Sequence, residues 1–411
     1  MRYLLLRLKR FCGFISGIVF FVSGILKLMD PVGAGLIMDG YYSFLHLGFL
    51  SFSSKIMGTA FALAETVIGT GLITGVWRRC MGLAAIILQG LFTLLTLLLI
   101  IFNPEMDCGC FGEAIHLTHA QTFIKNLILM VLLLIYYIPS KHLGETRKKK
   151  YVSFALVCTS LAAFTVFSWL SIPLVDYTAY KPGTDLKDAS VNADEMYESI
   201  FIYEKDGVQE SFTLGHLPDS TWTFVNVETR LKEGYSDTHA SLSFYETTSG
   251  EYADSLTTEG PVMVVSLYKP EISAKSWKKI EKFMTAANNA GFRTILLTTS
   301  AEATPEALKH ITYISDYKTL ISLNRSNGGA AFFQNGVLIR KWSKAGYPDQ
   351  EDLQDIILSD STETSIAHYS KGSLAYKASF YMFLQFCCCC NYFLYWNGVT
   401  PSTGQSITLL T

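Results

Sequence analysis

Charged residues are scarce in this chain, and cysteine is missing from one long part of it. Lys, Arg, Asp and Glu together make up only 17% of the 411 residues, and the formal net charge is −2. No basic stripe is present, so the charge pattern gives no support for a nucleic-acid partner. Residues 176–361 contain no cysteine, and this segment therefore cannot exchange thiols by itself.

Apolar residues make up 50% of the chain and are concentrated in its first part. Apolar runs there are each close to the ~20 residues that cross a bilayer core. They lie at 11–28, 56–76, 81–102, 120–138 and 152–172. One such run could be a buried core helix, but a series of them predicts a multi-pass membrane protein in contact with lipid.

Lysine and arginine are distributed unevenly among the connections, which predicts the orientation. Basic residues cluster before the first run, between the second and third, and between the fourth and fifth. The connections 29–55 and 103–119 hold only Lys55. The pattern predicts a cytoplasmic N-terminus, and the membrane in which we expect the protein is the inner membrane of a bacterium. Residues 176–361 and the connection 103–119 are expected on the external, periplasmic side, which permits disulfides.

The connection between the third and fourth runs contains Cys108 and Cys110, separated by Gly109. Gly109 lacks Cβ and can adopt the positive φ that a sharp bend between the cysteines needs. A disulfide across so small a ring would be strained, and strained exposed disulfides are the labile ones that accept and pass on electrons. The pair is thus a candidate redox site, and His116 is a candidate to support its thiolate.

Other readings of the cysteine pair stay open. The pair could form a fixed structural disulfide, or it could remain as inert thiols. Cys108, Cys110, His116 and His119 could also offer sulfur and nitrogen ligands to zinc, although their spacing is tighter than in common zinc motifs. We expect no metal at this site.

Glu65 lies near the middle of the second apolar run, where a carboxylate is costly and is usually functional or paired. Lys27, near the outer end of the first run, is a candidate partner. Further polar groups available to the bundle are Gln89, Lys125 and Asn126. Glu65 could be a structural clamp, or it could contact a proton or a quinone ring that serves the cysteines. The sequence identifies no firm cofactor, and a membrane quinone is the candidate.

Three stretches of the membrane half together resemble the DoxX-like MauE family, which is named for methylamine utilisation. They are FISGIVFFVSGILKLMDPVGAG, ALAETVIGTGLITGVWRR and NPEMDCGCFGEAIHLTHAQTFIKN. The resemblance covers roughly residues 8–140 and implies a four-helix membrane module with a redox role, in disulfide formation or in maturation of exported partners. It implies no methylamine substrate. The fifth run and the large polar segment go beyond the simplest form of the family.

The polar segment that follows has its own order of predicted elements. Residues 176–260 predict strands, with a hairpin at the Asp-Gly of EKDGVQE. Residues 261–361 read strand, helix, strand, helix, hairpin, helix, an order that resembles a thioredoxin-like domain. The Cys-x-x-Cys after the first strand and the cis-proline before the hairpin are both missing. We therefore expect this domain to bind an unidentified exported protein.

The sequence as a whole predicts a membrane α-helical bundle followed by an external α/β domain. Its expected parts are a four-helix MauE/DoxX-like module at 1–140, a basic cytoplasmic loop with the fifth helix at 141–175, a β-rich connecting region at 176–260, a thioredoxin-like domain at 261–361, and a low-complexity cysteine and aromatic tail at 362–411 outside the fold.

The preferred function is an inner-membrane redox accessory protein whose Cys108–Cys110 pair exchanges thiols and disulfides with exported partners. If the protein is an enzyme, it is expected to be a thiol–disulfide oxidoreductase, quinone-linked or not. The alternative is a non-catalytic scaffold or assembly factor in which the pair is a structural disulfide. A transporter that uses Glu65 has less support, because no inverted repeat is evident.

Overall fold

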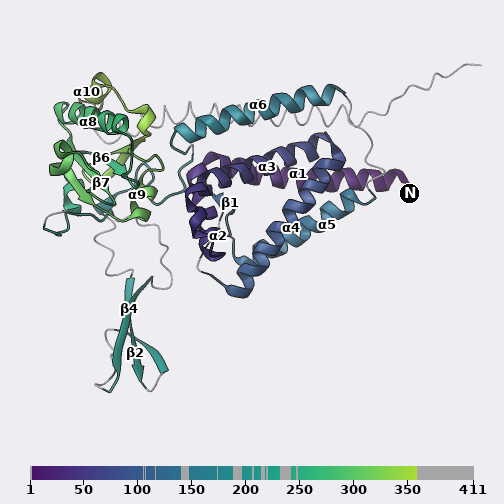
Figure 1. Cartoon of the computed structure of the whole chain (residues 1–411), viewed down its shortest axis with the longest axis horizontal. Coiled ribbons are helices and arrows are strands. Elements are labelled where there is room, and N and C mark those ends of the chain that lie inside the picture. Colours follow the sequence, from purple (N-terminus) through teal and green to yellow (C-terminus); the bar gives the residue numbers. More distant parts are fainter. Residues whose placement is uncertain are drawn as a thin grey trace, which may run out of the picture. The chain divides into compact units, whose positions relative to one another are not determined.

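A computed structural model describes most of the chain. The described residues are 2–104, 106, 108–115, 117–139, 148–173, 175–187, 197–205, 208–213, 218, 221–231, 242–246 and 249–358. They form two compact units that are divided after Tyr177, and each unit is treated separately below (Figure 1). The first is the membrane unit. His116 and the tail 362–411 lie outside the described residues, so the expectations about them stay predictions.

The membrane unit contains the helices that hydropathy predicted. They are α1 (Arg2–Met29), α3 (Ser54–Thr74), α4 (Arg78–Phe102), α5 (His119–Tyr137) and α6 (Lys148–Leu170). Within the described residues, these are the five segments whose length and composition allow them to cross a membrane, counting the turn before α3 with that helix. The prediction of a multi-pass membrane protein is confirmed.

An additional helix occupies the connection between the first two spans. It is α2 (Pro31–Phe44), and it is followed by the 3-10 turn η1 (Gly48–Ser53). Asp30 begins α2 because its carboxylate accepts a hydrogen bond from the Gly33 amide at 2.9 Å, while Pro31 takes the first helical position, where no amide donor is needed. The chain therefore turns at Asp30 and returns as a second, shorter helix.

Helices α1 and α3 approach each other closely through small residues (Figure 1). A Cβ at Gly24 would lie 2.6 Å from the Ala62 carbonyl oxygen, and a Cβ at Gly69 would lie 2.7 Å from the Gly17 carbonyl oxygen. Neither position has room for a side chain. Small residues allow this backbone contact in membrane helices, and the contact sets how far polar side chains reach from one helix to the other.

Buried lysines close two helix ends in the membrane unit. The Lys9 ammonium donates to the Ile138 carbonyl at 2.5 Å, and the Lys150 ammonium donates to the Thr74 carbonyl at 2.5 Å. The last carbonyls of a helix lack partners within it, so these bonds satisfy the ends of α5 and α3. In Figure 1 the N-terminal part of α1 lies at one end of this unit, and α2 and β1 (Cys110–Glu113) lie at the other.

The second unit contains two sheets. The smaller has the strand order β3-β2-β4, with β2 (Tyr197–Lys205), β3 (Val208–Thr213) and β4 (Thr223–Leu231), all antiparallel. Lys205 pairs with Val208, which agrees with the hairpin that the Asp-Gly sequence predicts. The larger sheet has the order β10-β9-β6-β7-β8-β5.

The strands of the larger sheet run in both directions. They are β5 (Tyr245–Glu246), β6 (Pro261–Leu267), β7 (Arg293–Thr298), β8 (Thr312–Ile314), β9 (Gly329–Gln334) and β10 (Val337–Trp342). Strands β6, β7 and β8 are parallel, and β9 and β10 form an antiparallel hairpin at the edge next to β6. The hairpin turns at Asn335 and Gly336, which both have positive φ, as a two-residue Asn-Gly turn requires.

Helices cover both faces of this mixed sheet. Alternate residues of β6 face opposite sides, because side chains alternate along a strand. Met263, Val265 and Leu267 pack with α8 (Ala274–Asn289) and α10 (Gln350–Leu358), whereas Val262 and Val264 pack with α9 (Tyr317–Leu323) on the other face. The predicted strands and helices of 261–361 are largely confirmed, except that residues 306–311 form the 3-10 turn η4 (Glu306–Ile311). The thioredoxin-like assignment stays a prediction.

Residues from the expected connecting region also enter this core. Leu186, Leu242 and Phe244 are buried with the α9 face of the sheet, and β5 extends the sheet beyond β8. The larger sheet and its core therefore include residues that come before the three-stranded sheet in the sequence and residues that come after it.

Candidate site at the cysteine loop

The two cysteines lie where the chain leaves α4 and enters β1. Neither cysteine forms a disulfide; Cys108 is buried at 5% exposure and Cys110 is half-buried. Gly109 between them has φ +62, and the Ile37 side chain occupies the space in which its Cβ would stand. The bend therefore needs glycine for two independent reasons, its backbone conformation and the close approach of α2.

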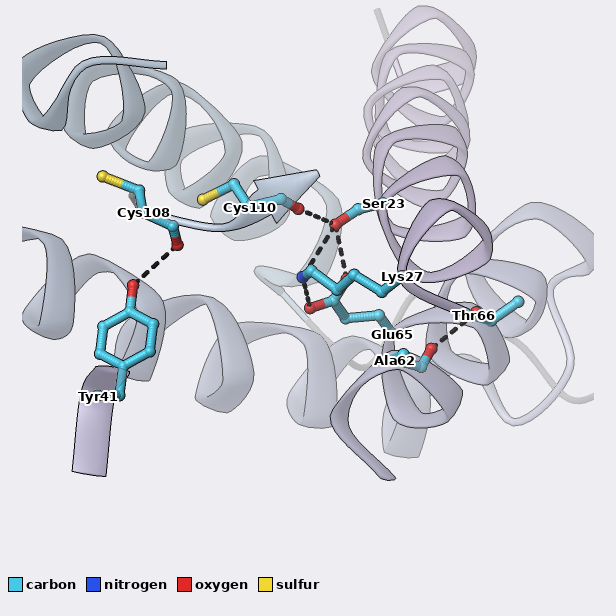
Figure 2. Close-up of polar contacts among 8 residues, drawn as sticks. All are labelled: Ser23, Lys27, Tyr41, Ala62, Glu65, Thr66, Cys108 and Cys110. Atoms are coloured by element: carbon cyan, nitrogen blue, oxygen red, sulfur yellow. Dashed lines mark hydrogen bonds and ion pairs between the residues drawn. The ribbon is translucent and has the colours of Figure 1, made fainter. Parts of the chain in front are cut away.

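Hydrogen bonds hold the backbone of the cysteine loop on both sides of Gly109. The Tyr41 hydroxyl of α2 donates to the Cys108 carbonyl at 2.9 Å, and the Ser23 hydroxyl of α1 lies 2.6 Å from the Cys110 carbonyl. Figure 2 shows that the Cys110 carbonyl points toward Ser23 while its sulfur points to the opposite side, as does the sulfur of Cys108. The carbonyls of Cys108 and Cys110 thus anchor the loop to α2 and α1.

The second half of the loop ends at a capped helix start. Thr118 caps α5, and its hydroxyl and the Gln121 side chain form a reciprocal capping box. His119, a candidate ligand in the zinc reading, has its Nε2 2.9 Å from the Met106 carbonyl. That contact places His119 on the backbone of the same loop.

A buried charged pair lies behind the loop. The Lys27 Nζ lies 2.5 Å from Glu65 Oε1, and the two side chains are 12% and 1% exposed, respectively. The Ser23 hydroxyl lies 2.6 Å from the second carboxylate oxygen and 3.3 Å from the Lys27 ammonium (Figure 2). The α1–α3 contact at Gly24 positions this cluster. A hydroxyl has a single proton, so Ser23 can donate fully either to Glu65 or to the Cys110 carbonyl.

A cavity of about 250 Å³ lies among α1 to α5 and the cysteine loop. Its walls are mainly apolar, from residues such as Val19, Phe92 and Leu95, while its lining also includes Lys27 and Glu65. Cys108, Gly109 and Cys110 contribute another part of the lining. Thus a single cavity touches both the cysteine pair and the charged pair.

The other polar residues that the sequence singled out meet at this cavity as well. The Gln89 side chain donates to the Asn126 carbonyl at 3.2 Å, and the Asn126 amide donates to Thr96 Oγ1 at 3.2 Å. The Lys125 ammonium lies 4.8 Å from the centroid of the Phe111 ring. Gln89, Asn126, Thr96 and Lys125 all line the cavity. The structure therefore brings together, at one cavity, the predicted polar residues of four helices, α1, α3, α4 and α5.

Sequence reasoning missed Ser23 and Tyr41. Burial raises the pKa of the Tyr41 hydroxyl, and the neighbouring Cys110 and Cys108 add to this effect. Tyr41 therefore remains a neutral donor to the loop. Ser23 could have been noticed because it precedes Lys27 by four residues, which places the two side chains on one face of α1. No local signal marks Tyr41.

The membrane-crossing helices surround a cavity, and a cysteine pair forms part of its lining. These features define a multi-pass membrane protein with a candidate thiol site. Residues 3–139 match the model of a family described as methylamine utilisation protein MauE. The match covers about one third of the chain and spans α1 to α5. The part of the chain that is similar to this family therefore includes the first four spans.

A second family model matches the smaller sheet. Residues 197–234, which contain β2 to β4, match a domain of unknown function, DUF8463. Neither the curated proteins nor the solved structures include a match to this chain.

Proposed function

We propose that the protein is a membrane thiol–disulfide oxidoreductase that oxidises the thiols of exported proteins through Cys108 and Cys110. The observation that supports this most directly is the geometry of the cysteine loop. Its carbonyls are anchored by Tyr41 and Ser23, whereas the two cysteines form no disulfide and lie at the wall of a cavity. A site of this kind can alternate between dithiol and disulfide without losing the bonds that position it.

The reaction proceeds by ordinary thiol–disulfide exchange. In the oxidised protein, a thiolate of the partner attacks one sulfur of the Cys108–Cys110 disulfide. An S–S bond to the partner forms as the internal S–S bond breaks, and the released cysteine leaves as a thiolate that takes up a proton. A second partner thiolate then displaces the cysteine that is still attached. The partner gains a disulfide, and Cys108 and Cys110 return as thiols.

The different exposure of the two cysteines assigns their roles. Cys110 is half-buried, whereas Cys108 is buried. We assign attack by the partner to Cys110, because a protein thiolate must reach the sulfur along the S–S axis. Cys108 is then the leaving thiolate in the first step and the cysteine that closes the disulfide again.

Charge and geometry support an external position for the loop. The two connections that are poor in Lys and Arg are those that meet in the structure, through Tyr41 and Cys108. At the other end of the unit, Lys9 and Lys150 bind the ends of α5 and α3. This separation of basic residues fits the positive-inside rule with the cysteines outside.

The second unit is proposed to bind the exported partner. Its described residues contain no cysteine, so it contributes no thiol chemistry. The order of elements in its mixed sheet favours a thioredoxin-like domain, a fold whose function depends on the site it carries. After five crossings, residues beyond α6 would emerge on the same side as the cysteine loop.

Thiol alkylation in intact membranes tests the proposal. The Cys108–Cys110 pair is expected to be found in both oxidised and reduced forms, with the ratio shifting when an exported dithiol substrate is overproduced. When the partner is supplied in its disulfide form, the Cys110 thiolate of a Cys108→Ser variant should attack it and accumulate a mixed disulfide as one partner thiolate is released, whereas Cys110→Ser should trap far less. A pair that is always oxidised, and whose loss only lowers protein abundance, would instead establish the scaffold with a structural disulfide.

A further inference from the structure

We propose that the cavity beside the cysteine loop binds a lipid-soluble quinone, which accepts the electrons of Cys108 and Cys110. This inference rests on the proposed function, because it supplies the oxidant that regenerates the disulfide. It assigns a substrate class to a cavity of about 250 Å³.

The walls of the cavity indicate a mainly apolar ligand. They are formed by membrane helices, and side chains such as Val19, Leu95 and Leu129 make up most of the lining. Pockets of this type bind apolar molecules and use a few placed polar groups to orient them. A membrane quinone has this composition, with an apolar ring and tail and two carbonyl oxygens.

The polar side chains at the cavity include hydrogen-bond donors as well as acceptors. The Lys27 ammonium has three N–H donors, and the described residues take two of them, through Glu65 and Ser23. The ammonium also lies 5.5 Å from the centroid of the Phe92 ring, itself part of the wall. The remaining N–H can bind a carbonyl oxygen, and Phe92 can pack against a flat ring.

The chemistry balances with a quinone as the acceptor. The two S–H bonds of Cys108 and Cys110 break and one S–S bond forms, which releases two electrons and two protons. The quinone takes up both, so that each carbonyl oxygen gains an O–H bond and the ring becomes a hydroquinone. Because the cysteines and Lys27 line the same cavity, the acceptor and the thiols can meet without a further carrier.

A lipid acyl chain is the competing occupant. It would satisfy the apolar walls but offers no acceptor to the Lys27 ammonium. A polar group in an apolar site is costly unless it is hydrogen-bonded, so the charged pair at the wall favours a ligand that carries oxygen atoms. An acyl chain also cannot oxidise thiols.

Binding is tested in the full chain, reconstituted in quinone-free phospholipid nanodiscs, with a decyl-substituted benzoquinone as the probe. A Cys108→Ser/Cys110→Ser variant removes the redox step, so that binding is measured alone. Val19→Trp fills part of the cavity, and the matched control is Ile18→Trp on the same helix, where the side chain is 40% exposed. We expect saturable binding that Val19→Trp weakens at least about tenfold, while Ile18→Trp leaves it unchanged.

A second variant tests the polar anchor. Lys27→Met/Glu65→Leu removes both charges together, so that no unpaired charge remains buried. Quinone binding should weaken about tenfold, the factor that one ordinary hydrogen bond gives. The melting temperature of each variant shows whether it is folded.

Electron transfer is measured with the native cysteines. Reduced protein should convert the benzoquinone to hydroquinone, one molecule for each cysteine pair, as followed by ultraviolet absorbance. A soluble small-molecule disulfide serves as an alternative oxidant. If the thiols react with that disulfide while the quinone neither binds saturably nor is reduced, the quinone inference is overturned and the proposed exchange stands. If neither oxidant reacts, the proposed function fails, and the binding measurement alone decides the cavity ligand.

Discussion

Ser23 and Cys110 are 87 residues apart in the sequence, yet the Ser23 hydroxyl lies 2.6 Å from the Cys110 carbonyl oxygen. The same hydroxyl lies 2.6 Å from Glu65. One side chain of α1 therefore connects the cysteine loop to the buried charged pair, and a change in either partner alters which acceptor receives the Ser23 proton.

The Ser23→Ala variant is expected to loosen the loop. It removes the one hydroxyl proton for which the Glu65 carboxylate and the Cys110 carbonyl compete, with an expected loss of about 1–3 kcal/mol in the free energy of unfolding and faster alkylation of Cys110. Ser16→Ala is the matched control on α1, because the Ser16 hydroxyl is buried without a hydrogen-bond partner among the described residues. Equal effects of the two substitutions on alkylation would contradict the role of Ser23.

The Lys27–Glu65 pair predicts a difference between single and double variants. Glu65→Leu alone leaves a buried ammonium without its carboxylate, and we expect it to cost about 3–5 kcal/mol. Lys27→Met/Glu65→Leu should recover most of this stability, since no charge is left behind. Melting temperatures of the single and double variants in one detergent measure the difference. A double variant as unstable as Glu65→Leu would argue against an ion pair.

The positive φ of Gly109 predicts a specific effect of a methyl group. Gly109→Ala should cost at least about 1–2 kcal/mol for its left-handed backbone, in addition to displacing Ile37. The displaced loop would expose Cys108 and raise its alkylation rate. Gly48→Ala is a suitable control, because no atom lies within 4 Å of the position a Cβ would take there and its φ is not positive. Unchanged Cys108 reactivity in Gly109→Ala would disprove the steric requirement.

Tyr41 predicts a pH dependence at the alkaline end. Its pKa is raised in the folded protein by burial, so above pH ~10 the unfolded chain loses a proton that the native state retains. Stability should be unaffected by this group below that pH and should fall as the pH rises above it. In Tyr41→Phe the alkaline decline should be shallower, and at neutral pH about 1 kcal/mol should be lost with the bond to Cys108. Identical alkaline slopes for the variant and the parent would refute this.

The parts of the fold that were predictable are those with a strong local signal. The spans follow from their apolar length, the Asn335-Gly336 hairpin from its turn residues, and the start of α5 from the Thr118–Gln121 box. Helix α2 was not foreseen as a separate element. Its role comes from contacts with distant residues, such as Ile37 at Gly109, which hydropathy does not encode.

Most residues of the candidate site could be predicted from the sequence, but the fact that they meet in one place could not. Glu65 attracts attention because carboxylates are rare within membrane segments, and Cys108 and Cys110 because they flank a single glycine in the connection between two spans. Their association depends on the close contact of α1 and α3, and on Tyr41, which is 67 residues from the carbonyl that it binds. Distances of this kind are set by packing between helices.

In the second unit, β8 and α9 are short elements with little periodicity, and they too were missed.

The lysines that bind helix ends limit which charge changes can be used to invert the orientation of this protein in the membrane. Lys9 and Lys150 count toward the basic clusters that favour retention of a loop in the cytoplasm, but their ammonium groups also hold the Ile138 and Thr74 carbonyls. Replacing either lysine to invert the protein would fray a helix terminus at the same time. Topology reporters are therefore better combined with charge changes at Arg10 or Arg79, which would leave both termini intact.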